Sequence, residues 1–143
     1  MKNTPRHGST LIELIVALVI MATLLLAGVP GAAALRNRSA VRASTTELVS
    51  ALALARSIAL AESRIVAIAF DTAAGSARVF APPDTLLDLP LRRRYGVTLS
   101  ATRDSIAYGP TGRGYGAANV TLTIRRRHAA DTIVVSRLGR VKS

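Results

Sequence analysis

The pattern of hydrophobic and polar positions divides the chain into an apolar N-terminal segment and a region of shorter, patterned segments. From Leu14 to Leu35 no side chain is ionisable, and only Thr23 is polar. A helix over these residues spans about 33 Å at about 1.5 Å per residue, which matches a hydrocarbon core of about 30 Å. The pattern therefore predicts a transmembrane helix over residues 9–35.

Charged residues near this segment indicate its orientation. Lys2 and Arg6 precede it with His7, and a positive flank stays on the cytoplasmic side. We therefore expect a single-pass protein of the bacterial inner membrane whose residues 36–143 lie in the periplasm. Glu13 stands inside the apolar run, where a carboxylate is costly unless it meets a positive partner. Glu13 is therefore a candidate functional residue.

The helical pattern continues beyond the apolar segment in amphipathic form. Apolar residues recur at three- and four-residue spacing from Val41 to Ala61. Pro30 removes one backbone hydrogen bond, which kinks a helix without ending it when the pattern resumes. The sequence predicts one long helix to about residue 62, kinked at Pro30, with a membrane half and an amphipathic half.

The rest of the chain predicts short antiparallel strands. β-Branched or alternating segments separated by turn-forming residues lie at 65–70, 77–80, 95–100, 105–108, 120–125 and 132–136, with a last strand end at 139–142. The segment 86–91 contains Pro90, so we expect a packed connection or an edge segment there. A turn over 127–131 joins two strands in a hairpin. The predicted fold class is α+β, with the amphipathic half-helix packed on one face of an antiparallel sheet of five to seven strands.

Composition and motifs argue against an enzyme. The chain has no cysteine, and aromatic residues make up 3% of it, so a thiolate metal site or a base-stacking platform is not expected. The glycine-rich segment 109–116 lacks the Lys-Ser/Thr of a phosphate loop, and His128 lacks a second ligand or a carboxylate partner. We expect no catalytic residue, no metal and no cofactor.

Positive charge gathers in the C-terminal half. The net charge is +11; residues 9–91 balance six arginines against six acids, whereas residues 92–143 hold eleven basic residues against Asp104 and Asp131. This distribution fits an anionic partner, namely nucleic acid, an acidic secretion substrate or lipid head groups. It also fits a solvated face in a chain whose composition favours arginine.

Residues 6–15 combine a short basic leader that ends in Gly with the start of the apolar helix and read Arg-His-Gly-Ser-Thr-Leu-Ile-Glu-Leu-Ile. This segment resembles the prepilin-peptidase signal of type IV pilins and type II secretion pseudopilins, in which Glu stands at the fifth mature position. The resemblance implies cleavage between Gly8 and Ser9, N-methylation of Ser9, and pairing of Glu13 with the N-terminus of a neighbouring subunit. Ser9 departs from the usual Phe. The implied domains are a leader over 1–8, a transmembrane and filament-core helix over 9–35, and a globular pilin-like domain over 36–143.

Two other interpretations of the N-terminus stay open. A secretory signal peptide would end at the small residues Ala32–Ala34, although Glu13 and the length of the apolar run count against it. A plain membrane anchor is also compatible with the run, but it gives Glu13 no role.

Three segments of the C-terminal half, 108–113, 120–123 and 132–142, form a second recognisable pattern. The pattern resembles that of the GspH/FimT family of minor pseudopilins and pilins. It implies a type II secretion pseudopilin, assembling with other pseudopilins as a tip or initiation subunit after processing by prepilin peptidase. The alternative is a FimT-like minor pilin that binds DNA through a C-terminal Gly-Arg-x-Arg motif; here the motif is Gly139-Arg140-Val141-Lys142. The candidate anion-binding residues, which we expect on one face with Arg92–Arg94, are Arg113, Arg125, Arg126, Arg127, Arg140 and Lys142.

Overall fold

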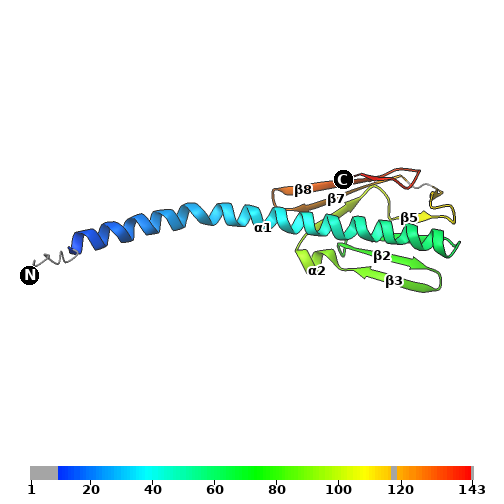
Figure 1. Cartoon of the computed structure of the whole chain (residues 1–143), viewed down its shortest axis with the longest axis horizontal. Coiled ribbons are helices and arrows are strands. Elements are labelled where there is room, and N and C mark those ends of the chain that lie inside the picture. Colours follow the sequence, from blue (N-terminus) through cyan, green and yellow to red (C-terminus); the bar gives the residue numbers. More distant parts are fainter. Residues whose placement is uncertain (1–9, 117–118, 143) are drawn as a thin grey trace, which may run out of the picture. The chain divides into compact units, whose positions relative to one another are not determined.

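The structure is a computed structural model that describes residues 10–116 and 119–142, with side chains described outside residues 26–30. The chain divides into one unit over Met1–Leu35 and a second over Arg36–Ser143, and we describe each separately. Gly8 and Ser9 lie outside the described residues. Helix α1 covers Leu11–Ala61 and therefore contributes to both units (Figure 1).

The first unit contains the N-terminal part of α1. Thr10 precedes the helix, and its Oγ1 accepts a hydrogen bond from the backbone N–H of Glu13 at 3.4 Å, which is the arrangement of an N-cap. The backbone is helical through position 30; the kink at Pro30 stays a prediction. Within the described residues, no helix combines the length and the apolar character needed to cross a membrane.

In the second unit, one stripe of α1 forms part of the hydrophobic core. Buried residues recur every three or four positions, as expected for a helix that packs with one face. They are Val41, Ser44, Thr45, Leu48, Ala51, Leu52, Ala55 and Ala59. This stripe confirms the predicted amphipathic half of the helix.

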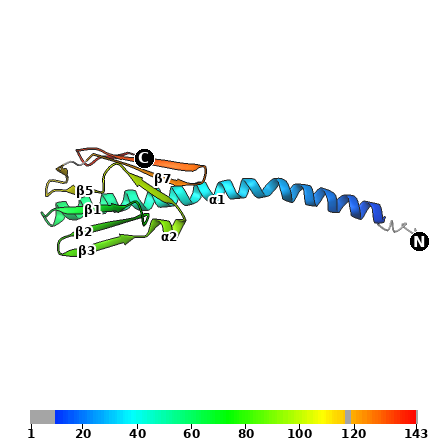
Figure 2. The same ribbon diagram turned by 180° about the vertical axis from the view of Figure 1, so that it is seen from behind.

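The strands form two antiparallel sheets (Figures 1 and 2). The five-stranded sheet has the order β3-β2-β1-β5-β6, with β1 at Val66–Asp71, β2 at Ser76–Ala81, β3 at Asp84–Leu89, β5 at Ser105–Tyr108 and β6 at Gly114–Tyr115. The four-stranded sheet has the order β4-β7-β8-β9, with β4 at Thr98–Ala101, β7 at Val120–Arg126, β8 at Ala129–Val135 and β9 at Val141–Lys142. Both sheets share one core with α1. The α+β class is confirmed, but the expectation of one sheet of five to seven strands was wrong.

A short helix, α2 at Leu91–Tyr95, replaces the beginning of the strand predicted over 95–100. Leu91 is buried and fixes this turn of helix against the core. Gly96 ends the helix with a positive φ of 64°, and its N–H donates to the carbonyl oxygen of Arg92 at 2.8 Å. The preceding segment is the edge strand β3, which ends before Pro90.

The β7–β8 hairpin is tighter than predicted. Arg126 pairs with Ala129, so only Arg127 and His128 form the turn, and Arg127 has a positive φ of 52°. Two-residue hairpin turns require such a φ because their twist must match that of the strands. Consequently Ala129, Ala130 and Asp131 belong to β8 and not to the turn.

Candidate functional site

Glu13 lies in the first turn of α1 with its side chain exposed. It forms no ion pair with another described residue. Neighbouring side chains from Leu11 to Leu25 are exposed as well, including Leu11 at 79% and Leu25 at 71%. An exposed apolar surface of this extent is typical of sites that contact another protein or a membrane. Glu13 is the one ionisable residue within it.

The basic residues expected on one face fall into two groups at opposite ends of the β7–β8 hairpin. Arg125 to Arg127 lie at the turn, where Arg126 pairs with Ala129. Arg140 and Lys142 follow the other end, where Val120 pairs with Val135. Six residue steps at about 3.3 Å separate the two ends by roughly 20 Å. The basic residues are thus spread along the length of the hairpin, and their placement on a single face stays a prediction.

The group away from the turn, which we call the loop-end group, comprises Arg113, Arg137, Arg140 and Lys142, all exposed. The loops over 109–114 and 136–140 bring them together, because the N–H of Gly114 donates to the carbonyl oxygen of Arg137 at 3.1 Å. Within the loop over 136–140, the N–H of Ser136 donates to the carbonyl oxygen of Arg140 at 2.9 Å. Sequence reasoning missed Arg137, although its place in the C-terminal basic run could have suggested it.

A half-buried arginine and two glycines hold the two loops together. Arg56 of α1 donates from Nε to the carbonyl oxygen of Gly112 at 2.8 Å and from Nη1 to that of Gly139 at 3.5 Å. Gly139 has a φ of +73°, and a Cβ there would lie 2.8 Å from the oxygen of Gly112. The glycine of the Gly139-Arg140 pair is thus required by the close approach of the loops.

The second group, which we call the turn-end group, comprises the exposed residues Arg38, Arg42, Arg125 and Arg127. Other arginines at this end are engaged: Nη1 of Arg126 donates to the carbonyl oxygen of Tyr95 at 2.5 Å, and Arg94 pairs with Glu47. Nη1 of Arg92 donates to the carbonyl oxygen of Ala73 at 2.7 Å.

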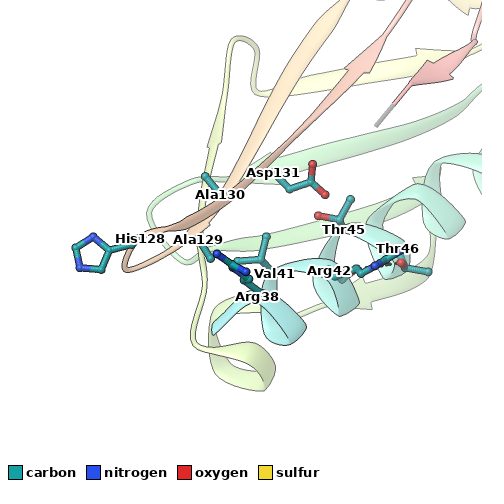
Figure 3. Close-up of a pocket in the computed structure, with 9 residues that line it drawn as sticks. All are labelled: Arg38, Val41, Arg42, Thr45, Thr46, His128, Ala129, Ala130 and Asp131. Carbon is teal, nitrogen blue, oxygen red and sulfur yellow. Dashed lines mark hydrogen bonds between the residues drawn. The ribbon is translucent and has the colours of Figure 1, made fainter. Parts of the chain in front are cut away.

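An open cleft of about 640 Å³ lies between α1 and the β7–β8 turn (Figure 3). Arg38, Arg42 and Thr45 line it from the helix, and Asp131 lines it from β8.

Burial raises the pKa of Tyr108, whose hydroxyl lies in the core without a hydrogen-bond partner among the described residues. No set of three or more acids or histidines among the described residues is placed to hold a metal ion.

Two family models match segments of the chain. Residues 44–139 match the family described as type II transport protein GspH, and residues 3–29 match the prokaryotic N-terminal methylation motif. No curated protein matches the chain.

Two crystal structures of the type IV minor pilin FimU from Pseudomonas aeruginosa strain PAO1 share its fold. One has a TM-score of 0.63 at 17% identity, over 73% of this chain and 88% of FimU. The other has a TM-score of 0.59 at 16% identity, over 71% and 90%. The family match covers more than half of the chain, and the chain therefore belongs to the GspH family of minor pseudopilins and minor pilins.

Proposed function

We propose that the protein is a minor pseudopilin of a type II secretion system, stored in the inner membrane through residues 9–35 and assembled into a pseudopilus as a tip or initiation subunit. The observation that carries the proposal is Glu13, an exposed carboxylate among exposed apolar side chains on a chain of the GspH family. In an apolar filament core such a charge needs a positive partner. The N-terminal ammonium released by cleavage after Gly8 supplies one, from a neighbouring subunit.

Processing is tested by the intact mass of protein purified from membranes. We expect a chain that begins at Ser9 and carries a methyl group on its N-terminal nitrogen. A mass that includes Met1, or a chain beginning after Ala34, would contradict the proposal.

Assembly is tested with Glu13→Ala. We expect this variant to be processed and to stay in the membrane fraction, but to be lost from the filament fraction released by shear. Glu62→Ala is the matched control, because Glu62 is an exposed glutamate of the second unit whose partner is Arg64. Equal amounts of both variants in the filament fraction would overturn the role of Glu13.

The second candidate function is DNA binding by a minor pilin, and the loop-end group favours it. Arg113, Arg137 and Arg140 extend from two joined loops, and none of them forms an ion pair with a described residue. Exposed arginines on adjoining loops would attract a polyanion in a salt-dependent manner without sequence specificity. Lys142 adds a point charge but lacks the bidentate geometry of arginine.

A matched pair of triple variants separates the two functions. R113Q/R137Q/R140Q neutralises the loop-end group, and R38Q/R42Q/R127Q removes the same charge from the turn-end group. If DNA is bound, the affinity for labelled duplex DNA at low salt falls only in the first variant.

Deletion of the gene is a second test. If the protein is a DNA-binding minor pilin, deletion reduces natural transformation. If it is a pseudopilin, deletion reduces protein export and leaves transformation unchanged.

A further inference from the structure

We propose that the cleft between α1 and the β7–β8 turn binds the phosphate of an anionic phospholipid head group, and so seats the second unit on the membrane before assembly. The inference rests on the proposed function, because it requires the chain to be stored in a membrane. It concerns a site that neither the N-terminal motif nor the loop-end group includes.

The cleft presents hydrogen-bond donors from one face of a helix. Arg38, Arg42 and Thr45 follow one another at four- and three-residue spacing, so their side chains lie along the same side of α1. Arginine matches the geometry of phosphate oxygens and stays charged throughout the physiological pH range. Both arginines are exposed, and neither forms an ion pair within the described part of the chain.

Thr45 gives the cleft a buried polar group without a protein partner. Thr45 is only 5% exposed, and its Oγ1 has no hydrogen-bond partner among the described residues. Figure 3 shows this oxygen turned toward the β7–β8 hairpin. A buried hydroxyl that lacks a partner is costly, and a phosphate oxygen would accept its hydrogen bond.

The other wall of the cleft limits which ligands fit. Ala129 and Ala130 are small, and the imidazole of His128 extends outward at the turn (Figure 3). Among the described residues, Asp131 is the one carboxylate that lines the cleft, and its Oδ1 accepts the N–H of Thr132 at 2.8 Å. Two arginines against one carboxylate leave the cleft positive, so an anion is favoured over a cation.

Position along the chain identifies the anion as a lipid. Arg36 directly follows the uncharged run that ends at Leu35, and Arg38 and Arg42 come within seven residues of its end. Lysine and arginine are less frequent on the exported side of a membrane helix than on the cytoplasmic side, so three arginines on the exported side depart from the usual pattern. Phospholipid head groups are the anions that lie beside the end of such a helix, and they attract basic residues over short distances.

The test uses the full chain in nanodiscs of phosphatidylcholine alone, or of two parts phosphatidylcholine to one part phosphatidylglycerol. Because the chain has no cysteine, Thr132→Cys provides a single labelling position at an exposed residue of β8 that lies beside the cleft without lining it. The measurement is quenching of a fluorophore at this position by a spin label carried on the lipid head groups. We expect phosphatidylglycerol to increase quenching and added salt to reverse the increase.

Variants in the same labelled chain assign the effect first to the turn end and then to the cleft. R38Q/R42Q/R127Q changes both arginines of the cleft and the neighbouring Arg127 of the turn. It should remove the increase, since each arginine near an anionic surface changes the bound population by about fivefold. R113Q/R137Q/R140Q should retain it. Thr45→Val keeps the volume of the side chain and removes its buried hydroxyl, so it should weaken quenching without lowering thermal stability.

The other outcomes contradict the lipid site, the membrane storage or both. Equal quenching in both lipids, or equal loss in the two triple variants, overturns the lipid site while leaving the pseudopilin assignment intact. Competition by free glycerol phosphate would show that the cleft takes a soluble phosphate and not a lipid. A chain that does not enter nanodiscs overturns both this inference and the proposed membrane storage.

Discussion

Arg56 of α1 donates its Nε–H to the carbonyl oxygen of Gly112 at 2.8 Å, across 56 positions of the sequence. The same guanidinium reaches the carbonyl oxygen of Gly139, so one side chain joins the helix to both loops that carry the loop-end group. The arginines of that group are thus positioned by a residue that is itself half-buried and not available to a ligand.

Replacing Arg56 tests this arrangement. Arg56→Met keeps much of the apolar stem but leaves the oxygen of Gly112 without its donor, so we expect a loss of roughly 1–3 kcal/mol in the free energy of unfolding. Amide hydrogen exchange in residues 109–114 should accelerate. Arg93→Met, in the exposed part of α2, is the control and should change stability by less than about 0.5 kcal/mol. Equal effects would show that Arg56 does not hold the loops.

Gly139→Ala tests the close approach of the loops. The added Cβ would meet the oxygen of Gly112 at 2.8 Å while the backbone has a φ of +73°. We expect a loss of roughly 3 kcal/mol from strain and displacement together. Gly116→Ala is matched in backbone strain, with a φ of +69°, but its Cβ meets no described residue within 4 Å. It should cost only about 1 kcal/mol, and chemical denaturation measures the difference.

The pKa of Tyr108 predicts a loss of stability at alkaline pH. Burial raises this pKa in the folded protein, whereas the unfolded chain loses the proton near pH 10. Above about pH 10 the unfolded state binds fewer protons, so the free energy of unfolding falls as pH rises.

Tyr108→Phe should reduce that slope by up to about 1.4 kcal/mol per pH unit, without lowering stability at neutral pH. Tyr115→Phe, at a residue that is 59% exposed, should leave the slope unchanged. Urea denaturation at a series of pH values provides the measurement. An identical slope in wild type and Tyr108→Phe would contradict the prediction.

Leu52→Ala tests the buried stripe of α1. Leu52 is fully buried, and its truncation should cost roughly 2–5 kcal/mol. Leu54→Ala makes the same chemical change two positions away, at a residue that is 43% exposed. We expect it to cost less than about 1 kcal/mol in a thermal melt, because it opens no cavity.

The sequence was sufficient to predict α1 and most strands, because periodicity reports which side chains are buried. Val41, Leu48 and Leu52 repeat at helical spacing, and Val120 to Arg126 alternate as a half-buried strand does. Helix α2 was missed because five residues with three arginines form no apolar stripe. The division into two sheets was missed because it depends on pairings between distant segments, such as β1 with β5 and β4 with β7.

The candidate site was predicted less completely, for a related reason. The sequence placed Arg113, Arg127 and Arg140 in one basic half, but it could not assign each to an end of the β7–β8 hairpin. That assignment depends on the register of the hairpin and on Arg56, whose role required the two loops to meet. Cleavage after Gly8, methylation of Ser9 and the pairing of Glu13 stay predictions. Gly8 and Ser9 lie outside the described part of the chain.

The buried stripe of α1 also determines how the second unit bears mechanical load. Its buried residues extend from Val41 to Ala59, a distance of about 27 Å along the helix. Traction applied along the helix axis therefore acts on all these contacts at once, in shear, and does not peel them apart one by one. Under the proposed function, a pull on the N-terminal part of α1 during extraction from the membrane would therefore be resisted by the whole stripe.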